Sequence, residues 1–181
     1  MTGFIALLVS VELLVVSAWY WDRHKFGKEN ACIWDPGCLT EIDTHIPKKS
    51  VIYWEDSLHI PWLKLNRPNY ASFTQAAGII FDRQTAIEAE RRLSRLAKLG
   101  VHDGTLDWYS RPKLKLFQST AINFEGLVHV AQDQEVDFII LYKNFPEAEP
   151  KTFSNSIFEK QIYLYNCKFI RNMFIDVLKK L

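Results

Sequence analysis

The chain opens with a block of apolar residues, and apolar positions later recur in short runs and at helical spacing. The opening block, Gly3–Trp21, has the length of a membrane-spanning helix, because about 20 apolar residues cross the hydrocarbon core of a bilayer. It contains one charged residue, Glu12, and it ends in Trp19–Trp21, an aromatic run typical of the membrane interface. We therefore expect a transmembrane helix over residues 1–22.

Two other interpretations of this block are less favoured. A cleaved signal peptide would carry basic residues before the apolar run, and none is present, although Val16–Ala18 would suit a cleavage site. A buried soluble helix is disfavoured because no comparable partner helix exists. Glu12 near mid-span indicates either contact with another transmembrane helix or a proton site, or else a neutral carboxyl tolerated in a single span.

The clearest later unit is Gln75–Gly100, in which the hydrophobic period changes from that of a strand to that of a helix. Ala76–Phe81 is a short apolar run typical of a strand buried on both faces. Asp82 then suits the N-cap of a helix that ends at Gly100. The pattern predicts a helix with small and apolar residues on one stripe and mostly cationic residues elsewhere.

Further apolar runs predict strands over Ser50–Trp54, Trp62–Leu65, Leu114–Phe117, Val136–Tyr142 and Gln161–Phe169. Helical spacing predicts helices over residues 39–46, 122–131 and 170–181. Near-continuous apolar strands alternating with helices are typical of a parallel sheet covered on both faces. We expect an α/β fold: a linker with a short helix over residues 23–49, then a small three-layer α/β domain with a mainly parallel sheet over residues 50–181.

Composition and cysteine spacing bear on the cellular compartment and on the class of partner. The 181 residues carry a net charge of +1, so the total charge gives no reason to expect nucleic acid as a partner. Cys32 and Cys38 are close enough to form a disulfide, which would indicate an oxidising compartment, and their spacing does not predict a zinc site. Against that, Arg23, Lys25 and Lys28 lie directly after the apolar block, and the positive-inside rule would place the rest of the chain in the cytoplasm. No metal or cofactor is expected.

Several residues are candidates for chemistry or binding. Acidic and histidine side chains follow the strand at residues 50–54, where α/β proteins place ligand sites, and a second His-Asp pair lies in a predicted loop. Arg67 and Tyr70 suit hydrogen bonding to a phosphate or sugar, or equally the capping of a helix or the fixing of a loop. An arginine-rich helix face suits anionic lipid or an acidic partner, or an ordinary solvated surface. The remaining candidates are Glu55, Asp56, His59, His102 and Asp103 for catalysis, and Arg91, Arg92 and Arg95 for interaction.

In sequence order, these features resemble the C-terminal soluble region, with the last transmembrane helix, of bacterial multi-span membrane proteins that are poorly characterised and similar to polytopic lipid-linked-sugar glycosyltransferases. The resemblance covers roughly residues 1–170. It is carried by loose motifs: the apolar span and Cys32, Ile46-Pro47, Val51–Trp54, Trp62–Leu65, Arg67–Tyr70 with Ser72, Gln75–Phe81, Thr85–Glu88, Arg91-Arg92 and Val136–Leu141.

The resemblance implies the bacterial inner membrane, an extracytoplasmic domain, and catalysis in a first extracytoplasmic loop that this chain does not contain. None of the positions that carry the resemblance is a catalytic residue in that family, so the resemblance assigns no catalytic residue to this chain. The first hypothesis is therefore a membrane-tethered, non-catalytic accessory domain that binds a glycan, a lipid-linked sugar or another membrane protein. The alternatives are a membrane-anchored hydrolase or transferase that uses the acidic and histidine loops, and a membrane-bound protein-interaction module.

Overall fold

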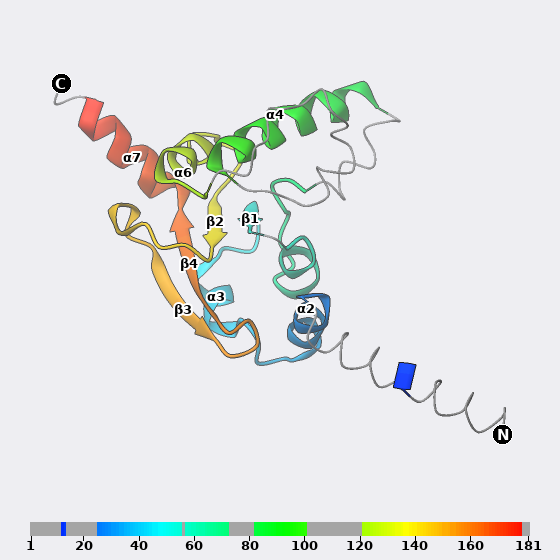
Figure 1. Ribbon diagram of the computed structural model, residues 1–181. Helices are drawn as coiled ribbons and strands as arrows, with labels where there is room; N and C mark the ends of the chain where they lie inside the picture. The colour runs from blue at the N-terminus through cyan, green and yellow to red at the C-terminus, as the bar shows by residue number, and fades with distance from the viewer. Residues whose placement is uncertain (1–11, 14–24, 56, 73–81, 101–120, 179–181) are drawn as a thin grey trace, which may run out of the picture.

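The computed structural model describes residues 12–13, 25–55, 57–72, 82–100 and 121–178 (Figure 1). Its centre is a four-stranded sheet in the order β1-β2-β4-β3. The strands are β1 (Ile52–Trp54), β2 (Phe138–Leu141), β3 (Lys151–Asn155) and β4 (Lys160–Asn166). β1 pairs with β2 in parallel, whereas β2–β4 and β4–β3 are antiparallel. The fold is therefore mixed α/β.

Alternate residues of the sheet enter two separate cores. In β2, Ile139 and Leu141 face one core while Phe138 and Ile140 face the other. The same alternation holds in β4, where Tyr163 and Tyr165 lie opposite Ile162 and Leu164. Burial on both faces explains why these strands are continuously apolar although most of their pairing is antiparallel.

The first core is covered by α4 (Arg83–Leu99), α6 (Phe124–Ala131) and α7 (Cys167–Leu178). Asp82 caps α4 by accepting a hydrogen bond from the Thr85 amide at 2.7 Å, and Gly100 ends it with φ of 90°, as predicted. α4 and α6 approach closely at Gly126, where a Cβ atom would lie 2.3 Å from Leu99 Cα. The cap of α6 joins the two helices, because Asn123 accepts from the Gly126 amide and donates to the Lys98 carbonyl.

The second core is covered by α2 (Lys25–Trp34), α3 (Thr40–His45) and the π-helix η1 (Ile60–Lys64). A disulfide joins Cys32 at the end of α2 to Cys38 before α3, with a Cα–Cα distance of 5.3 Å. Cys32 and Ile42 come from the stretch expected to be a linker, and both are buried in this core. Helices thus lie on both faces of the sheet (Figure 1).

Three sequence expectations need correction. Among the described strands the sheet is mainly antiparallel, since one of the three strand pairs, β1–β2, is parallel and the other two are antiparallel. The predicted strand Trp62–Leu65 lies largely within η1, whose Leu65 amide bonds to the Ile60 carbonyl. The predicted strand Gln161–Phe169 ends at Asn166, whose side chain accepts from the Phe169 amide in the first turn of α7.

The predictions for residues 50–54, 136–142, 39–46 and 122–131 are confirmed by β1, β2, α3 and α6. The strands predicted at residues 76–81 and 114–117 lie outside the described residues, as does the apolar block except Glu12 and Leu13. Within the described part of the chain, none of the helices is both long and apolar enough to cross a bilayer.

Candidate functional site

A pocket of about 500 Å³ lies between α4 and the segment Asn69–Ser72. Its volume falls within the range of small-molecule sites in proteins. One wall is the first half of α4, and Glu135, which precedes β2, completes the described lining. The lining combines polar and apolar surface and consists of Asn69, Tyr70, Ala71, Ser72, Gln84, Thr85, Glu88, Ala89, Arg92, Leu93 and Glu135.

The charged side chains in the pocket pair with one another. The Arg92 guanidinium donates to Glu88, to Glu135 at 3.0 Å and to the Tyr70 carbonyl at 2.7 Å. It also lies over the Tyr70 ring, 5.2 Å from the centroid. Glu88 bridges Arg92 and Arg91. The two arginines and two glutamates therefore hold each other in fixed positions.

Behind this group lies a more deeply buried carboxylate, Asp133, which is 5% exposed. Its Oδ2 accepts from the Tyr70 hydroxyl at 2.6 Å and from Arg91, and Arg95 Nε lies 3.5 Å away. Three arginines on α4 thus face Glu88, Asp133 and Glu135, so the charges of the cluster balance. We call these six charged residues the α4 ion-pair cluster.

Hydrogen bonds, ion pairs and burial together move the pKa values of Glu88, Asp133 and Tyr70 away from neutral pH. The hydrogen bond from Arg91 is the main cause that lowers the pKa of Glu88, to about 2. Burial opposes ionisation of Asp133, but hydrogen bonds from Tyr70, from the Glu135 amide and from Arg91 outweigh it and lower its pKa. Burial and the bond to Asp133 raise the pKa of Tyr70 far above its ordinary value. These three groups are unsuited to proton transfer near pH 7, since such catalysis needs a pKa near the working pH.

Arg67, a sequence candidate for ligand binding, is 6% exposed and is bonded within the protein. It donates to the carbonyls of Ile46 and Pro47, each at 2.8 Å, to that of Leu65, and to Asp43 at 2.9 Å. Its guanidinium therefore satisfies carbonyls at the end of α3. This matches the alternative role of capping a helix and fixing a loop.

The structure describes two of the five catalytic candidates, Glu55 and His59, and each has a partner outside the candidate set. Glu55 follows β1 and accepts from the Tyr142 amide at 2.8 Å, which joins the carboxyl ends of the two parallel strands. His59 Nδ1 instead lies 3.2 Å from Glu29 on α2, a carboxylate that is 4% exposed. Asp56, His102 and Asp103 lie outside the described residues. Among the residues that are described, no three His, Cys, Asp or Glu side chains gather as metal ligands would.

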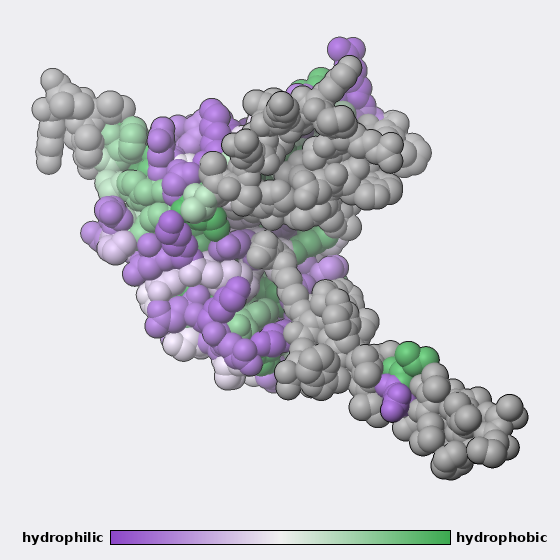
Figure 2. All heavy atoms as spheres, in the orientation of Figure 1, coloured by the Kyte–Doolittle hydropathy of each residue, from purple (hydrophilic) through white to green (hydrophobic). Residues whose placement is uncertain are grey.

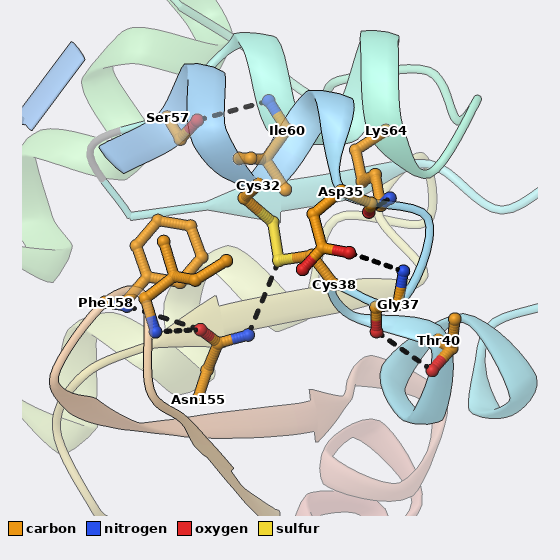
Figure 3. The surroundings of a disulfide bond; sticks show 11 residues. Cys32, Asp35, Gly37, Cys38, Thr40, Ser57, Ile60, Lys64, Asn155 and Phe158 are labelled. Carbon is orange, nitrogen blue, oxygen red and sulfur yellow. Dashed lines mark hydrogen bonds between the residues drawn. A yellow bond between two sulfur atoms is a disulfide. The ribbon is translucent and has the colours of Figure 1, made fainter. Parts of the chain in front are cut away.

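The disulfide is enclosed by neighbouring elements (Figure 3). Cys32 is fully buried and Cys38 is 4% exposed. Asn155 at the end of β3 places its amide nitrogen 3.6 Å from Cys38 Sγ, and Lys64 on η1 donates to the Asp35 carbonyl in the intervening loop. The bond therefore fastens α2 to α3 beneath η1. Glu12, the candidate for helix contact, is helical and exposed among the described residues.

The sequence singles out Tyr70 and Arg92, which line the pocket, but it predicts no pocket here. The pair Glu88–Arg92 follows from spacing along a helix, and it is present. Asp133 and Glu135 precede β2, and no local sequence pattern marks them as partners of α4. One indirect sequence feature could have indicated them: the two carboxylates directly precede an apolar strand, and such a strand packs close to a helix, here one that carries several arginines.

No protein-family model, curated protein or solved structure matches this chain.

Proposed function

We propose that the chain is a membrane-tethered, non-catalytic accessory domain that binds a hydroxyl-rich glycan, or the sugar of a lipid-linked precursor, in the pocket beside α4. The observation that carries this proposal is a pocket of about 500 Å³ whose charged groups are already ion-paired. The lining holds Arg92 between Glu88 and Glu135, and the α4 ion-pair cluster as a whole is neutral, so the pocket offers fixed donors and acceptors without an excess of positive charge. It suits a neutral polyol better than a lone anion.

The chemistry of the lining supports binding without catalysis. Carboxylates accept hydrogen bonds from hydroxyl groups, and guanidinium, amide and hydroxyl side chains donate them. Glu88 and Arg92 present both kinds of group on one helix face, with Gln84 and Thr85 one turn before. The low pKa of Glu88, about 2, makes it a poor base, and arginine does not act as an acid near neutral pH.

The proposed setting is the bacterial inner membrane, with the apolar block as a single span and the domain on the extracytoplasmic side. The Cys32–Cys38 disulfide supports that side, because disulfides persist in oxidising compartments. Glu12 would then be available to another transmembrane protein. The cations that follow the span favour the opposite orientation, so the side needs a direct test.

Binding is tested with the full chain in nanodiscs that contain polyprenyl-diphosphate-linked N-acetylglucosamine, and with the free sugar and its oligomers in solution. Ala89→Phe fills the pocket from its α4 wall and should weaken binding at least about tenfold, since a site that loses its space and its hydrogen bonds loses several kcal/mol. Ser94→Phe is the matched control, because Ser94 is exposed on the same helix and does not line the pocket. Equal affinity of the two variants, or no binding by the unmodified chain, would contradict the proposal.

The side of the membrane is tested separately. Ser94→Cys adds one exposed thiol, while the native cysteines are bonded or buried. A membrane-impermeant maleimide should label this variant in intact cells. Labelling that appears only after lysis would place the domain in the cytoplasm.

A further inference from the structure

Three large apolar side chains are exposed on two neighbouring elements of the second core. Trp34, the last residue of α2, is 82% exposed, and Trp62 and Leu63 on η1 are 45% and 62% exposed. α2 and η1 pack against each other. We call these three residues the tryptophan patch. Figure 2 shows how polar and apolar residues are interspersed on one face of the molecule. Most large apolar side chains of the described residues are buried, so this grouping needs a physical reason.

The outward direction of the patch is built into the fold. η1 buries Ile60 and Pro61 on its inner side, and Leu65 directly after it is 2% exposed. Two contacts then hold η1 against α2: Glu29 pairs with His59 at its start, and Lys64 at its end donates to the Asp35 carbonyl (Figure 3). Trp62 and Leu63 cannot turn inward without breaking these contacts.

The end of α2 is fixed in the same way. Cys32 is fully buried and bonded to Cys38, two residues before Trp34. The exposed indole therefore follows a covalently fastened helix end. The tryptophan patch is a rigid surface formed by packed elements.

The sequence indicates which medium covers this surface. α2 begins at Lys25, four residues after the aromatic run that ends the apolar block. Tryptophan prefers the interface of a bilayer, where its ring is in apolar surroundings and its N–H meets water or headgroups. Lys64 directly follows Leu63 and donates to the carbonyl of Asp35, the neighbour of Trp34, so it places a cation beside the patch, which suits the phosphates of lipid headgroups.

We propose that the tryptophan patch docks on the phospholipid headgroup region of the membrane that holds the apolar block, so that α2 lies along the bilayer surface. This inference rests on the membrane attachment in the proposed function and does not depend on glycan binding. Docking at this surface fixes the orientation of the domain and directs the α4 side of the sheet away from the lipid.

The test uses single cysteines in the full chain. Of the three native cysteines, Cys32 and Cys38 are bonded to each other and Cys167 is buried. An exposed cysteine introduced by mutation is therefore the thiol that a labelling reagent reaches. Leu63→Cys reports the patch. Ile175→Cys is the control, because Ile175 is 49% exposed on α7, which covers the opposite face of the sheet. Both side chains are exposed, so both variants should fold.

Each variant carries a fluorophore and is reconstituted in vesicles of phosphatidylcholine and phosphatidylglycerol that contain a headgroup-nitroxide lipid. The probe at position 63 should be quenched by the nitroxide lipid and about threefold less accessible to aqueous iodide than the probe at position 175, since an interfacial residue enters the headgroup boundary. Equal access of both probes to iodide in vesicles that retain the chain overturns the docking but leaves the membrane attachment intact. Shielding from iodide without quenching by the lipid indicates a protein contact and also overturns it. A chain that fails to float with the vesicles overturns both the attachment and the docking.

Discussion

The close approach of α4 and α6 at Gly126 leads to a prediction that reverses an ordinary rule. In a helix, Gly→Ala usually stabilises a protein by about 0.5–1 kcal/mol, because glycine loses more backbone freedom on folding. At Gly126, however, an added Cβ would lie 2.3 Å from both Leu99 Cα and the Lys98 carbonyl oxygen. We expect Gly126→Ala to destabilise the domain.

The magnitude follows from the atoms that collide. Both neighbours are backbone atoms, so no rotamer change relieves the contact, and α4 and α6 must separate by more than about 1 Å to restore ordinary packing distances. Leu99 and Leu127, which are fully buried, lie at this junction and lose contacts when it opens. Overpacking of a core costs about 1–3 kcal/mol, and the upper end applies here. After the helix-propensity gain, the net loss is about 2 kcal/mol.

The assay is thermal unfolding of the full chain in mild detergent, followed by far-ultraviolet circular dichroism. A loss of about 2 kcal/mol in a chain of this size lowers Tm by roughly 4–8 °C. Gly37→Ala is the matched control, because a Cβ there would meet Asp35 Oδ1 at 3.4 Å, an ordinary contact. The control should stay within about 0.5 kcal/mol of the unmodified chain. An unchanged or higher Tm for Gly126→Ala would refute the argument from close approach.

Three further predictions concern stability. Arg67→Met should lower the free energy of unfolding in urea by about 3 kcal/mol, because it leaves buried carbonyls without donors. Asp43→Ala removes an exposed partner of Arg67 and should lower it by less than about 1 kcal/mol. Equal losses for the two variants would assign the effect to the ion pair. Glu88 has a pKa lowered from 4.5 to about 2, so the stability it contributes is present above pH 4.5 and is lost as pH falls toward 2. In acid titrations the difference in unfolding free energy between the unmodified chain and Glu88→Gln should shrink over that interval, and a constant difference would contradict it. Dithiothreitol should leave the Cys32–Cys38 bond intact until the domain unfolds, because both sulfurs are covered. Rapid reduction of the native chain, seen by thiol alkylation, would count against that burial. The Cys32→Ser/Cys38→Ser variant should lose about 2 kcal/mol of unfolding free energy.

The elements that sequence predicted well are those whose signals are local. α4 begins after Asp82 and ends at Gly100 because capping depends on neighbouring residues, and both caps are visible in the sequence. The direction of strand pairing is not local, since β2 lies between β1, far back in the chain, and β4, which comes after it. Continuous apolar strands are typical of parallel sheets, but here they result from cores on both faces. β3 was missed because it is an edge strand that buries only Phe153.

The candidate site shows the same division. Glu88 and Arg92 are one helical turn apart, so their pairing was predictable. Their partner Glu135 lies 43 residues beyond Arg92, and only the fold brings it to the pocket. Arg67 is the reverse case: its turn-rich segment left ligand binding and the fixing of a loop equally open, and the fold decides between them because the carbonyls of Ile46 and Pro47 accept from its guanidinium.

The buried disulfide has a consequence for the timing of synthesis. Cys32 and Cys38 are six residues apart, whereas the sheet that covers them needs β2 and β4, roughly 100 residues later. At about 5–20 residues per second, the two thiols spend roughly 5–20 s in a chain that cannot yet enclose them. The sulfurs are therefore most open to oxidants during that interval, since the finished domain covers both of them. A bond formed at that stage records the redox conditions that residues 32–38 met before the rest of the domain was made.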